Sequence, residues 1–453
     1  MIPELLLSLL LFLPPSGLWA GQSIYYLRGV KSRSQESALV TPRTLSIIVP
    51  IKGENPNTLN GLLRNLANIN YPISNLEVVV ISDDDPERFQ RISEEIRAPQ
   101  GLEVQLFRRE ERRGFKSAAL AYGLRKVKGE LVMTLDVDSR LPADSLQRAL
   151  NKMEREECDA VTLTWVGYGN SDSALSKGLA VSTKFGSVSL LLGRYASGMK
   201  VFPVGSGTIY RKSSLLLVGG WDPDVIQDDL DLGARMISKG LKVCASEAEV
   251  QVQVPEDLKA YYVQQTRWAM GGMEVLSRHM STILQADSSL IKKMDLLFYL
   301  TQYFPVATTL LGALILAILS PWGKFGFWVI FPFSIWLVSI AIYTYLLFKE
   351  ARREGLSLRE TLLALGRVSA YTVSISPFIF LWIFKAFSKG RTYVVTPKGK
   401  SGRVKIIYPM AILGVLLMVA AILYLIRLQL LPGLWLLYYS FPYLYTPLKN
   451  LRE

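Results

Sequence analysis

The chain has 453 residues, of which 50% are hydrophobic and 20% are charged, and this mixture argues against a single soluble core and suggests a soluble part joined to a membrane part. The formal net charge is +13. Because Lys and Arg cluster beside the apolar runs, the charge favours a membrane surface and excludes nucleic acid as the expected partner.

Cysteine and histidine are scarce: the chain contains Cys158, Cys244 and a single histidine, His279. The two cysteines lie in separate apolar stretches without metal-ligand spacing, so we expect neither a disulfide framework nor a zinc site. One histidine leaves almost no candidates for a Ser/His/Asp arrangement. We expect His279 to be a surface or packing residue of an amphipathic helix.

The first apolar run lies within residues 1–27. A signal peptide carries Lys or Arg before its apolar core, whereas here Glu4 precedes the core and Arg28 and Lys31 follow it. We therefore predict a transmembrane helix with its N-terminus outside.

Residues 45–285 mix charged and apolar residues as a globular domain does. Four β-rich runs predict strands: LSIIVPI, NLEVVVIS, LEVQLF and GELVMTLDVD. Helix-like segments separate them: NTLNGLLRNLANI, PERFQRISEEI and FKSAALAYGLRKV. This alternation predicts βαβ crossovers and a mostly parallel, Rossmann-like sheet that is buried on both faces.

Polar groups follow three of these strands, as Lys52 with Glu54, as the acidic run 83–85, and as Asp136 with Asp138. One acidic strand end is often only a helix cap or a turn. Since ligands of parallel sheets bind beyond the carboxyl ends of the strands, we expect these three ends to converge on one site.

Period-two alternation would place the carboxylates of Asp136 and Asp138 on one side of the strand, about 7 Å apart. Mg²⁺ and Mn²⁺ prefer oxygen ligands and are often held by one or two carboxylates together with substrate phosphates. The pair therefore predicts a metal site that offsets the charge of a departing diphosphate.

A second acidic group lies in VIQDDLDLGARMISKGL, whose apolar residues have helical spacing. Asp228 and Asp229 would stand at the helix N-terminus, where carboxylates are favoured as caps. Alternatively, one of them is the base that takes the proton from an attacking hydroxyl.

The third group is YYVQQTRWAMGG, in which Gln264, Arg267 and Trp268 would share one helix face. The Arg is suited to phosphate and the Trp ring to the C–H face of a sugar. The same triplet also occurs as an interfacial anchor before a membrane span.

The remainder of the chain is dominated by apolar runs. Residues 290–348 contain two runs long enough to cross about 30 Å of hydrocarbon, and the basic loop KEARREG follows them. In residues 357–404, a spanning helix at 361–387 would export the basic segment KGRTYVVTPKGKSGRVK, so we predict an interfacial or re-entrant helix. Residues 405–447 supply two more spans. Five spans give a multi-pass cell-membrane protein with a cytoplasmic catalytic domain.

Taken in order, the acidic strand end, the DxD pair, the acidic pair, QxxRW and the membrane helices resemble the family 2 glycosyltransferases. The resemblance is to their membrane-integrated branch, which contains the cellulose, hyaluronan and chitin synthases. It implies an α/β GT-A fold and inverting, Mg²⁺- or Mn²⁺-dependent transfer of a sugar from a UDP- or GDP-sugar to a saccharide or lipid-linked acceptor.

The resemblance also assigns roles to residues of this sequence. The nucleotide or its diphosphate would contact Pro50, Glu54, Asp83 or Asp84, Lys116, Gln264 and Arg267, and the metal would be held by Asp136 and Asp138. The acceptor would contact Trp268 and the FPVGSG loop, with Phe202, Gly205 and Ser206.

Asp229 matches the base of the family. Gln227 and Asp228 replace the usual Thr and Glu, so the choice between Asp228 and Asp229 stays open. The segment YVVTPK, with Tyr393, Thr396 and Lys398, resembles a gating loop that follows an interfacial helix in cellulose synthase.

These expectations favour an enzyme that extends a polysaccharide and passes it through its own helices. The alternative is transfer of one sugar to a diacylglycerol, a ceramide-like lipid or a polyprenyl phosphate. A transporter or non-enzymatic scaffold would instead predict a P-loop or acidic groups within the spans, and the sequence has neither.

Overall fold

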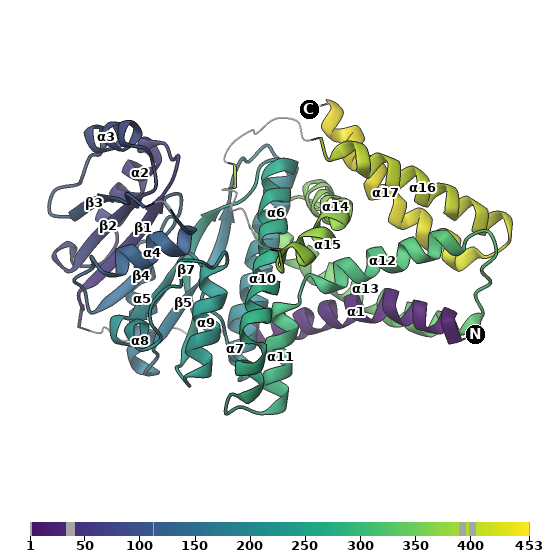
Figure 1. Cartoon of the computed structure of the whole chain (residues 1–453), viewed down its shortest axis with the longest axis horizontal. Helices are drawn as coiled ribbons and strands as arrows, with labels where there is room; N and C mark the ends of the chain where they lie inside the picture. Colours follow the sequence, from purple (N-terminus) through teal and green to yellow (C-terminus); the bar gives the residue numbers. More distant parts are fainter. Residues whose placement is uncertain (1, 33–40, 112, 389–395, 398–404, 453) are drawn as a thin grey trace.

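The computed structural model describes residues 2–32, 41–111, 113–388, 396–397 and 405–452 (Figure 1). An α/β domain forms one end of the molecule and a group of long helices forms the other, with α6, α10, α14 and α15 lying between them (Figure 1). The predicted residues Tyr393 and Lys398 lie outside the described residues.

The α/β domain is built on a seven-stranded sheet of order β3-β2-β1-β4-β6-β5-β7. The strands are β1 (Leu45–Ile51), β2 (Leu76–Ser82), β3 (Glu103–Arg108), β4 (Leu131–Thr134), β5 (Ala160–Tyr168), β6 (Thr208–Arg211) and β7 (Val243–Gln253). β6 is antiparallel to β4 and β5, and the other pairs are parallel. The predicted mostly parallel sheet and the four predicted strands are confirmed.

Helices cover both faces of this sheet, namely α2 (Pro56–Ala67), α3 (Pro86–Glu95), α4 (Lys116–Leu124), α5 (Ser145–Arg155), α8 (Lys212–Leu217) and α9 (Asp228–Ser238). Alternation along β1 divides the core. Ile47 packs with α2 and α5 on one face, whereas Ile48 packs with α4 and α9 on the other. A strand buried on both faces explains the continuous apolar run LSIIVPI.

The remaining helices are α1 (Ile2–Lys31), α6 (Ala174–Ser187), the π-helix η2 (Val188–Gly193), α7 (Arg194–Ala196), α10 (Leu258–Gln285), α11 (Leu290–Leu300), α12 (Phe304–Leu319), α13 (Ile330–Arg353), α14 (Leu358–Ser374), α15 (Ser376–Lys385), α16 (Ile407–Ile426) and α17 (Leu430–Arg452); single turns η1 (Ile73–Asn75) and η3 (Phe327–Val329) complete the set. Among the residues that the structure describes, three segments are long and apolar enough to cross a membrane: Glu4–Lys31, Phe327–Arg353 and Ile407–Ile426.

Two bent helix pairs raise the number of candidate spans to five. α11 and α12 were expected to form one span, but their axes meet at 64°. α14 and α15, the predicted interfacial segment, meet at 50°. In both pairs a proline opens the second helix, because proline lacks the N–H that would continue the first. The span predicted at 431–447 corresponds to α17. This helix packs along α16, but it is not among the candidate membrane spans.

α1 approaches the α/β domain closely where it crosses η2. A Cβ on Gly193 would lie 1.8 Å from the carbonyl oxygen of Tyr25, and one on Gly29 would lie 2.3 Å from that of Val188. Glycine at both positions therefore permits contact between the two backbones.

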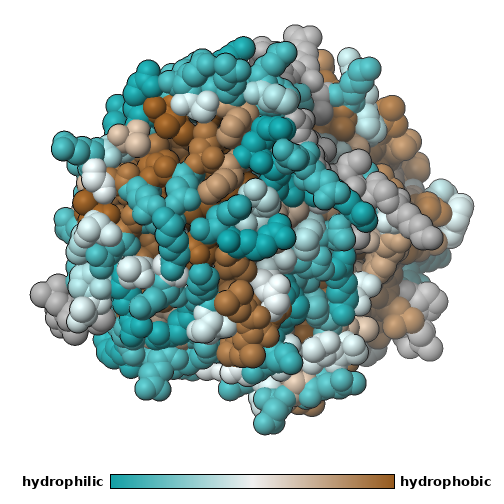
Figure 2. Space-filling model, turned by 60° about the vertical axis from the view of Figure 1, so that its left-hand side comes forward, coloured by the Kyte–Doolittle hydropathy of each residue, from teal (hydrophilic) through white to brown (hydrophobic). Residues whose placement is uncertain are grey.

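The face of the molecule that carries the sheet is mostly hydrophilic, with hydrophobic patches between the polar residues (Figure 2).

The expectation that the cysteines are unpaired was wrong, because Cys158 and Cys244 form a disulfide with a Cα–Cα distance of 6.0 Å. β5 and β7 are parallel neighbours, and the register that places Ala160 opposite Val243 brings the cysteines together. Sequence spacing alone does not reveal this register. Glu156 lies beside both sulfurs, but a disulfide offers no thiolate to a metal.

Candidate functional site

A cavity of about 790 Å³ lies between the carboxyl ends of the sheet strands and the helices α6 and α10. Most of the predicted site residues line it, namely Pro50, Glu54, Asp83, Lys116, Asp136, Asp138, Gly205, Asp228, Asp229, Gln264, Arg267, Trp268 and Thr396. The predicted residues Asp84, Phe202 and Ser206 lie behind its wall.

The three polar strand ends converge as expected, because β2, β1 and β4 are neighbours in the sheet. The reason that Asp136 and Asp138 share the cavity differs from the expected one. β4 ends at Thr134, and both carboxylates belong to the following turn, in which the Ser139 N–H donates to the Asp136 carbonyl at 2.9 Å. A turn, and not strand alternation, therefore presents the pair.

The acidic run after β2 divides its roles among its members. Asp83 reaches the cavity and accepts two hydrogen bonds from Arg109, at 2.6 and 2.7 Å. Asp84 turns back and accepts from the Gly53 N–H at 2.7 Å, which fixes the loop after β1. Asp85 caps α3 through the Arg88 N–H. Of the two predicted alternatives, Asp83 is the one that faces the cavity.

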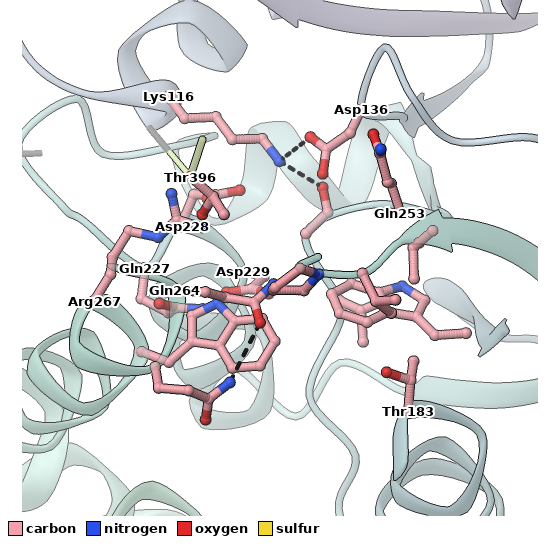
Figure 3. Close-up of a pocket in the computed structure, with 18 of the residues that line it drawn as sticks. Lys116, Asp136, Thr183, Gln227, Asp228, Asp229, Gln253, Gln264, Arg267 and Thr396 are labelled. Carbon is pink, nitrogen blue, oxygen red and sulfur yellow. Dashed lines mark hydrogen bonds and ion pairs between the residues drawn. The ribbon is translucent and has the colours of Figure 1, made fainter. Parts of the chain in front are cut away.

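Lys116, the first residue of α4, is the cation at the centre of the acidic groups. Its Nζ donates to Asp136 Oδ1 at 2.6 Å and to the Gly205 carbonyl at 3.0 Å (Figure 3). A Cβ on Gly205 would lie 3.3 Å from Asp229 Oδ2 and 3.6 Å from Lys116 Nζ. The glycine thus leaves room for a lysine and an aspartate to approach the same backbone segment.

Asp228 and Asp229 occupy the first turn of α9 and are each only 8% exposed. Burial raises the pKa of Asp228 to about 7, an effect that Asp229 and Asp136 add to and Lys116 opposes. Burial also raises the pKa of Asp229, against the influence of Lys116 and of a hydrogen bond from Gln227. Two carboxyls in one buried site share their titration, and such groups are poised to exchange protons near neutral pH.

The third aspartate of the DDLDL segment has a structural role. Asp231 Oδ2 accepts from Arg235 at 2.7 Å, and Asp231 Oδ1 lies 2.7 Å from His279 Nε2 on α10. Burial opposes ionisation here, but His279 and Arg235 together lower the pKa of Asp231. His279, which we expect to be a surface or packing residue, joins α10 to α9 through this contact with Asp231.

Gln264, Arg267 and Trp268 share one face of α10 and line the cavity, as the helical spacing predicted. The indole of Trp268 lies 6.4 Å from that of Trp165 on β5. Trp165 Nε1 donates to the Ser206 carbonyl at 2.7 Å, so this second indole is held in place. Arg267 lies on the same side of the cavity as Lys116 and Asp228 (Figure 3).

The loop from Phe202 to Gly207 reaches the cavity through Pro203, Val204 and Gly205. Phe202 is buried and stacks on Tyr299 with a centroid distance of 5.1 Å. Ser206 Oγ accepts from the Asp136 N–H at 3.0 Å. These two predicted acceptor residues therefore hold the site in shape from behind and do not face the cavity.

Sequence reasoning missed several lining residues, among them Trp165, Thr183, Gln253, Gln265 and Tyr303. Trp165 lies in an apolar run that was not assigned as a strand, and an aromatic residue near a strand end was its only signal. Thr183 lies on α6 and Tyr303 lies in the turn between α11 and α12. The position of both relative to the sheet depends on tertiary packing, so no local pattern identifies them.

Comparison with known proteins agrees with this geometry. Residues 131–386 match the family described as glycosyl transferase family group 2. A probable glycosyltransferase of Sulfolobus acidocaldarius is 41% identical over 461 residues, which cover 100% of this chain and 99% of that protein. A β-monoglucosyldiacylglycerol synthase of Trichormus variabilis is 27% identical over 60% of this chain and 58% of its own length.

Among solved structures, the mannosyltransferase PcManGT of Pyrobaculum calidifontis, in complex with GDP-Man and Mn²⁺, has a TM-score of 0.56 at 19% identity over 83% of this chain and 99% of its own. This likeness shows the fold. Relatives named for lipid products and relatives named for polysaccharide products both match, so they favour neither acceptor class. The chain belongs to the family 2 glycosyltransferases and has the GT-A fold, joined to three to five candidate membrane-crossing helices.

Proposed function

We propose that this enzyme transfers a sugar, with inversion and with the help of a divalent metal, from a cytoplasmic nucleotide sugar to an acceptor held at the membrane surface. The observation that carries the proposal is the convergence of the three polar strand ends, the Asp228–Asp229 pair and the QxxRW face on one cavity. These elements are far apart in the sequence, and the fold brings their polar side chains to one cavity.

Asp136 and Asp138 are suited to hold Mg²⁺ or Mn²⁺ together with a diphosphate. They offer carboxylate oxygens at the cavity, and the side chain of Asp136 is 43% exposed. Such a metal, when bound, offsets the negative charge of the leaving diphosphate. PcManGT binds GDP-Man and Mn²⁺, which supports a UDP- or GDP-sugar as the donor here. Pro50, Glu54 and Asp83 would bound the nucleotide, and Lys116 and Arg267 would contact the phosphates.

Asp229 is the proposed base, with Asp228 as its neighbour. The acceptor hydroxyl would give its proton to the Asp229 carboxylate while its oxygen attacks the anomeric carbon from the side opposite the diphosphate. The bond between that carbon and the diphosphate oxygen breaks, and the nucleoside diphosphate leaves. The raised pKa of each aspartate improves its match to proton transfer near pH 7.

Packing of the long helices supports a lipid-anchored acceptor over a translocated polymer. The ring of Phe12 on α1 contacts those of Phe333, Trp336 and Trp435, at centroid distances of 5.5, 5.8 and 5.6 Å. None of these four rings lines the cavity. They fill the space between α1, α13 and α17, so a polysaccharide could not pass between these three helices.

Extension of a polysaccharide is the second candidate. Thr396 and Pro397, which belong to the predicted gating segment, line the cavity, as a loop that follows a growing chain would. Product size decides between the candidates: one added sugar indicates a lipid acceptor, and a ladder indicates a polymer.

The test is release of nucleoside diphosphate by the purified full-length protein with a panel of UDP- and GDP-sugars, followed by the variant Asp229→Asn. We expect this variant to lose transfer by at least about 10²-fold. Asp231→Asn is the matched control, since Asp231 lies in the same turn but faces Arg235 and His279. Retained activity in Asp229→Asn refutes the assignment of the base.

A further inference from the structure

The catalytic cavity continues past Trp268 into the helical part of the molecule, and this extension differs from the catalytic end in charge. We propose that it binds a neutral saccharide, so that the acceptor is a sugar hydroxyl of a glycolipid or glycan and neither a bare lipid alcohol nor a polyprenyl phosphate. This inference rests on the proposed function. We call the extension the neutral arm and define it by Thr183, Gly186, Gln265, Tyr303, Tyr343 and Thr372.

The charged side chains that line the cavity come from the ends of β1, β2 and β4, from Glu256 between β7 and α10, from α4, from α9 and from Arg267. Within the described part of the chain, no lining side chain contributed by α6, η2, α11, α13 or α14 is charged. In Figure 3, Lys116, Asp228 and Arg267 lie on one side of the cavity and Thr183 lies on the other, while Gln253 lies next to Asp136.

Three cations on or beside the helices around the neutral arm are already paired with carboxylates, and Arg367 of α14 donates to the hydroxyl of Tyr445 at 2.9 Å. Lys177 of α6 donates to Glu360 at 2.6 Å, and Lys184 of α6 pairs with Glu249. Arg194, just after η2, is buried against Asp295. A lipid phosphate in the arm would lose its hydration without gaining any of these charges, which is unfavourable.

The groups that do line the arm are typical of carbohydrate recognition. Tyr303 Oη donates to Gln265 Oε1 at 2.8 Å, and Gln265 Nε2 lies 3.3 Å from Gln264 Oε1. The hydroxyls of Tyr261 and Thr372 lie 2.6 Å apart across α10 and α14. Amides and hydroxyls of this kind both donate and accept, as sugar hydroxyls require, and aromatic rings pack on the apolar faces of a sugar. A bare acyl or polyprenyl chain would offer these polar groups no hydrogen bond beyond those they already make to one another.

α6 leaves open space in the arm at Gly186. Gly186 lines the cavity, and a Cβ placed on it would meet no atom within 4 Å. Substitution by leucine therefore projects a side chain into the arm without disturbing the helix, where leucine is in fact favoured over glycine. Gly366 of α14 offers the matched position, because it is exposed, it does not line the cavity, and a Cβ on it also meets nothing within 4 Å.

The experiment uses the full-length protein in phosphatidylcholine vesicles with the donor found by nucleoside diphosphate release. The acceptors are the octyl glycosides of glucose, galactose, mannose and N-acetylglucosamine, compared with farnesyl phosphate and dioleoylglycerol. We expect transfer to at least one octyl glycoside and at least tenfold less to the other two lipids. Gly186→Leu should lower the ratio of transfer to donor hydrolysis at least tenfold, and Gly366→Leu should leave that ratio unchanged.

Transfer to farnesyl phosphate or dioleoylglycerol in preference to every glycoside overturns the inference. Donor hydrolysis without transfer to any glycoside overturns it as well, and so does an unchanged ratio in Gly186→Leu. Absence of donor hydrolysis with every nucleotide sugar is a different result, because it contradicts the proposed function itself.

Discussion

Lys116 Nζ lies 2.6 Å from Asp136 Oδ1, and its charge opposes the rise that burial causes in the pKa values of Asp228 and Asp229. One cation at the start of α4 thus acts on the proposed metal carboxylate and on the proposed base. Its side chain is 17% exposed, so these interactions are only weakly screened by solvent. The donor half and the acceptor half of the site are coupled electrostatically through this lysine.

Replacing Lys116 by methionine should move the acidic limb of the pH–rate profile to higher pH. The base must be ionised to accept a proton, and without the lysine the pKa values of Asp228 and Asp229 rise further. We also expect transfer at pH 7 to fall on the order of 10²-fold, since a charge at the leaving group is lost. The measurement is kcat/KM for nucleoside diphosphate release from pH 5 to 9. Lys126→Met, at an exposed position just beyond α4, is the control, and an unshifted limb in Lys116→Met contradicts the coupling.

Asp228→Asn should stabilise the protein at alkaline pH although it impairs the site. The pKa of Asp228 is about 7 in the folded chain, against about 3.9 when unfolded, so folding takes up a proton between these values and the free energy of unfolding falls as pH rises. Above pH 7 the buried charge is destabilising in full, and asparagine removes it. We expect a higher Tm than the parent at pH 8 and a difference that shrinks towards pH 5, measured in detergent.

The exposed Asp172 provides the comparison for that experiment. Asp172→Asn should leave the Tm of the parent unchanged at both pH values. If Asp228→Asn instead lowers the Tm at pH 8, then Asp228 is stabilised as a carboxylate and the direction of its pKa shift is wrong.

The strands and the polar strand ends could be predicted because each depends on local pattern. Apolar runs such as LSIIVPI have the length and β-branched content of buried strands, and the order of βα units makes their ends meet. The helical spacing of Gln264, Arg267 and Trp268 likewise determined their shared face. These features require only the chain's own periodicity.

What could not be predicted depends on packing between distant segments. DDLDL offers three similar aspartates, and only the position of α9 against α10 separates Asp231, which meets His279, from the two that face the cavity. Phe202 and Ser206 lie in the expected loop, yet the loop turns both inward. The disulfide depends on the register of β5 and β7, and the approach of α1 to η2 depends on a glycine at each side of the crossing.

Gly193→Ala should be strongly destabilising because the added Cβ would lie 1.8 Å from the Tyr25 carbonyl oxygen. The clash involves backbone on both sides, so α1 must move away from η2, at a cost of about 1–3 kcal/mol or more. The measurement is Tm in detergent together with protease sensitivity at the end of α1. Gly17→Ala, also on α1 but with nothing within 4 Å of its Cβ, should behave as the parent does. Equal stability of the two variants would show that α1 does not pack on η2 at Gly193.

Removal of the disulfide should lower stability without changing the chemistry of the site. Cys158 and Cys244 are separated by 86 positions, and neither lines the cavity. Closing a loop of this size destabilises the unfolded chain by about 4.6 kcal/mol in the chain-entropy treatment. The double variant Cys158→Ser, Cys244→Ser should therefore have a lower Tm, and dithiothreitol should lower the Tm of the parent but not that of the variant. Disulfides are rare in the cytosol outside hyperthermophiles. Alkylation of free thiols in freshly lysed cells therefore also tests the predicted cytoplasmic location of this domain. Free thiols in the native protein would contradict the Cys158–Cys244 bond.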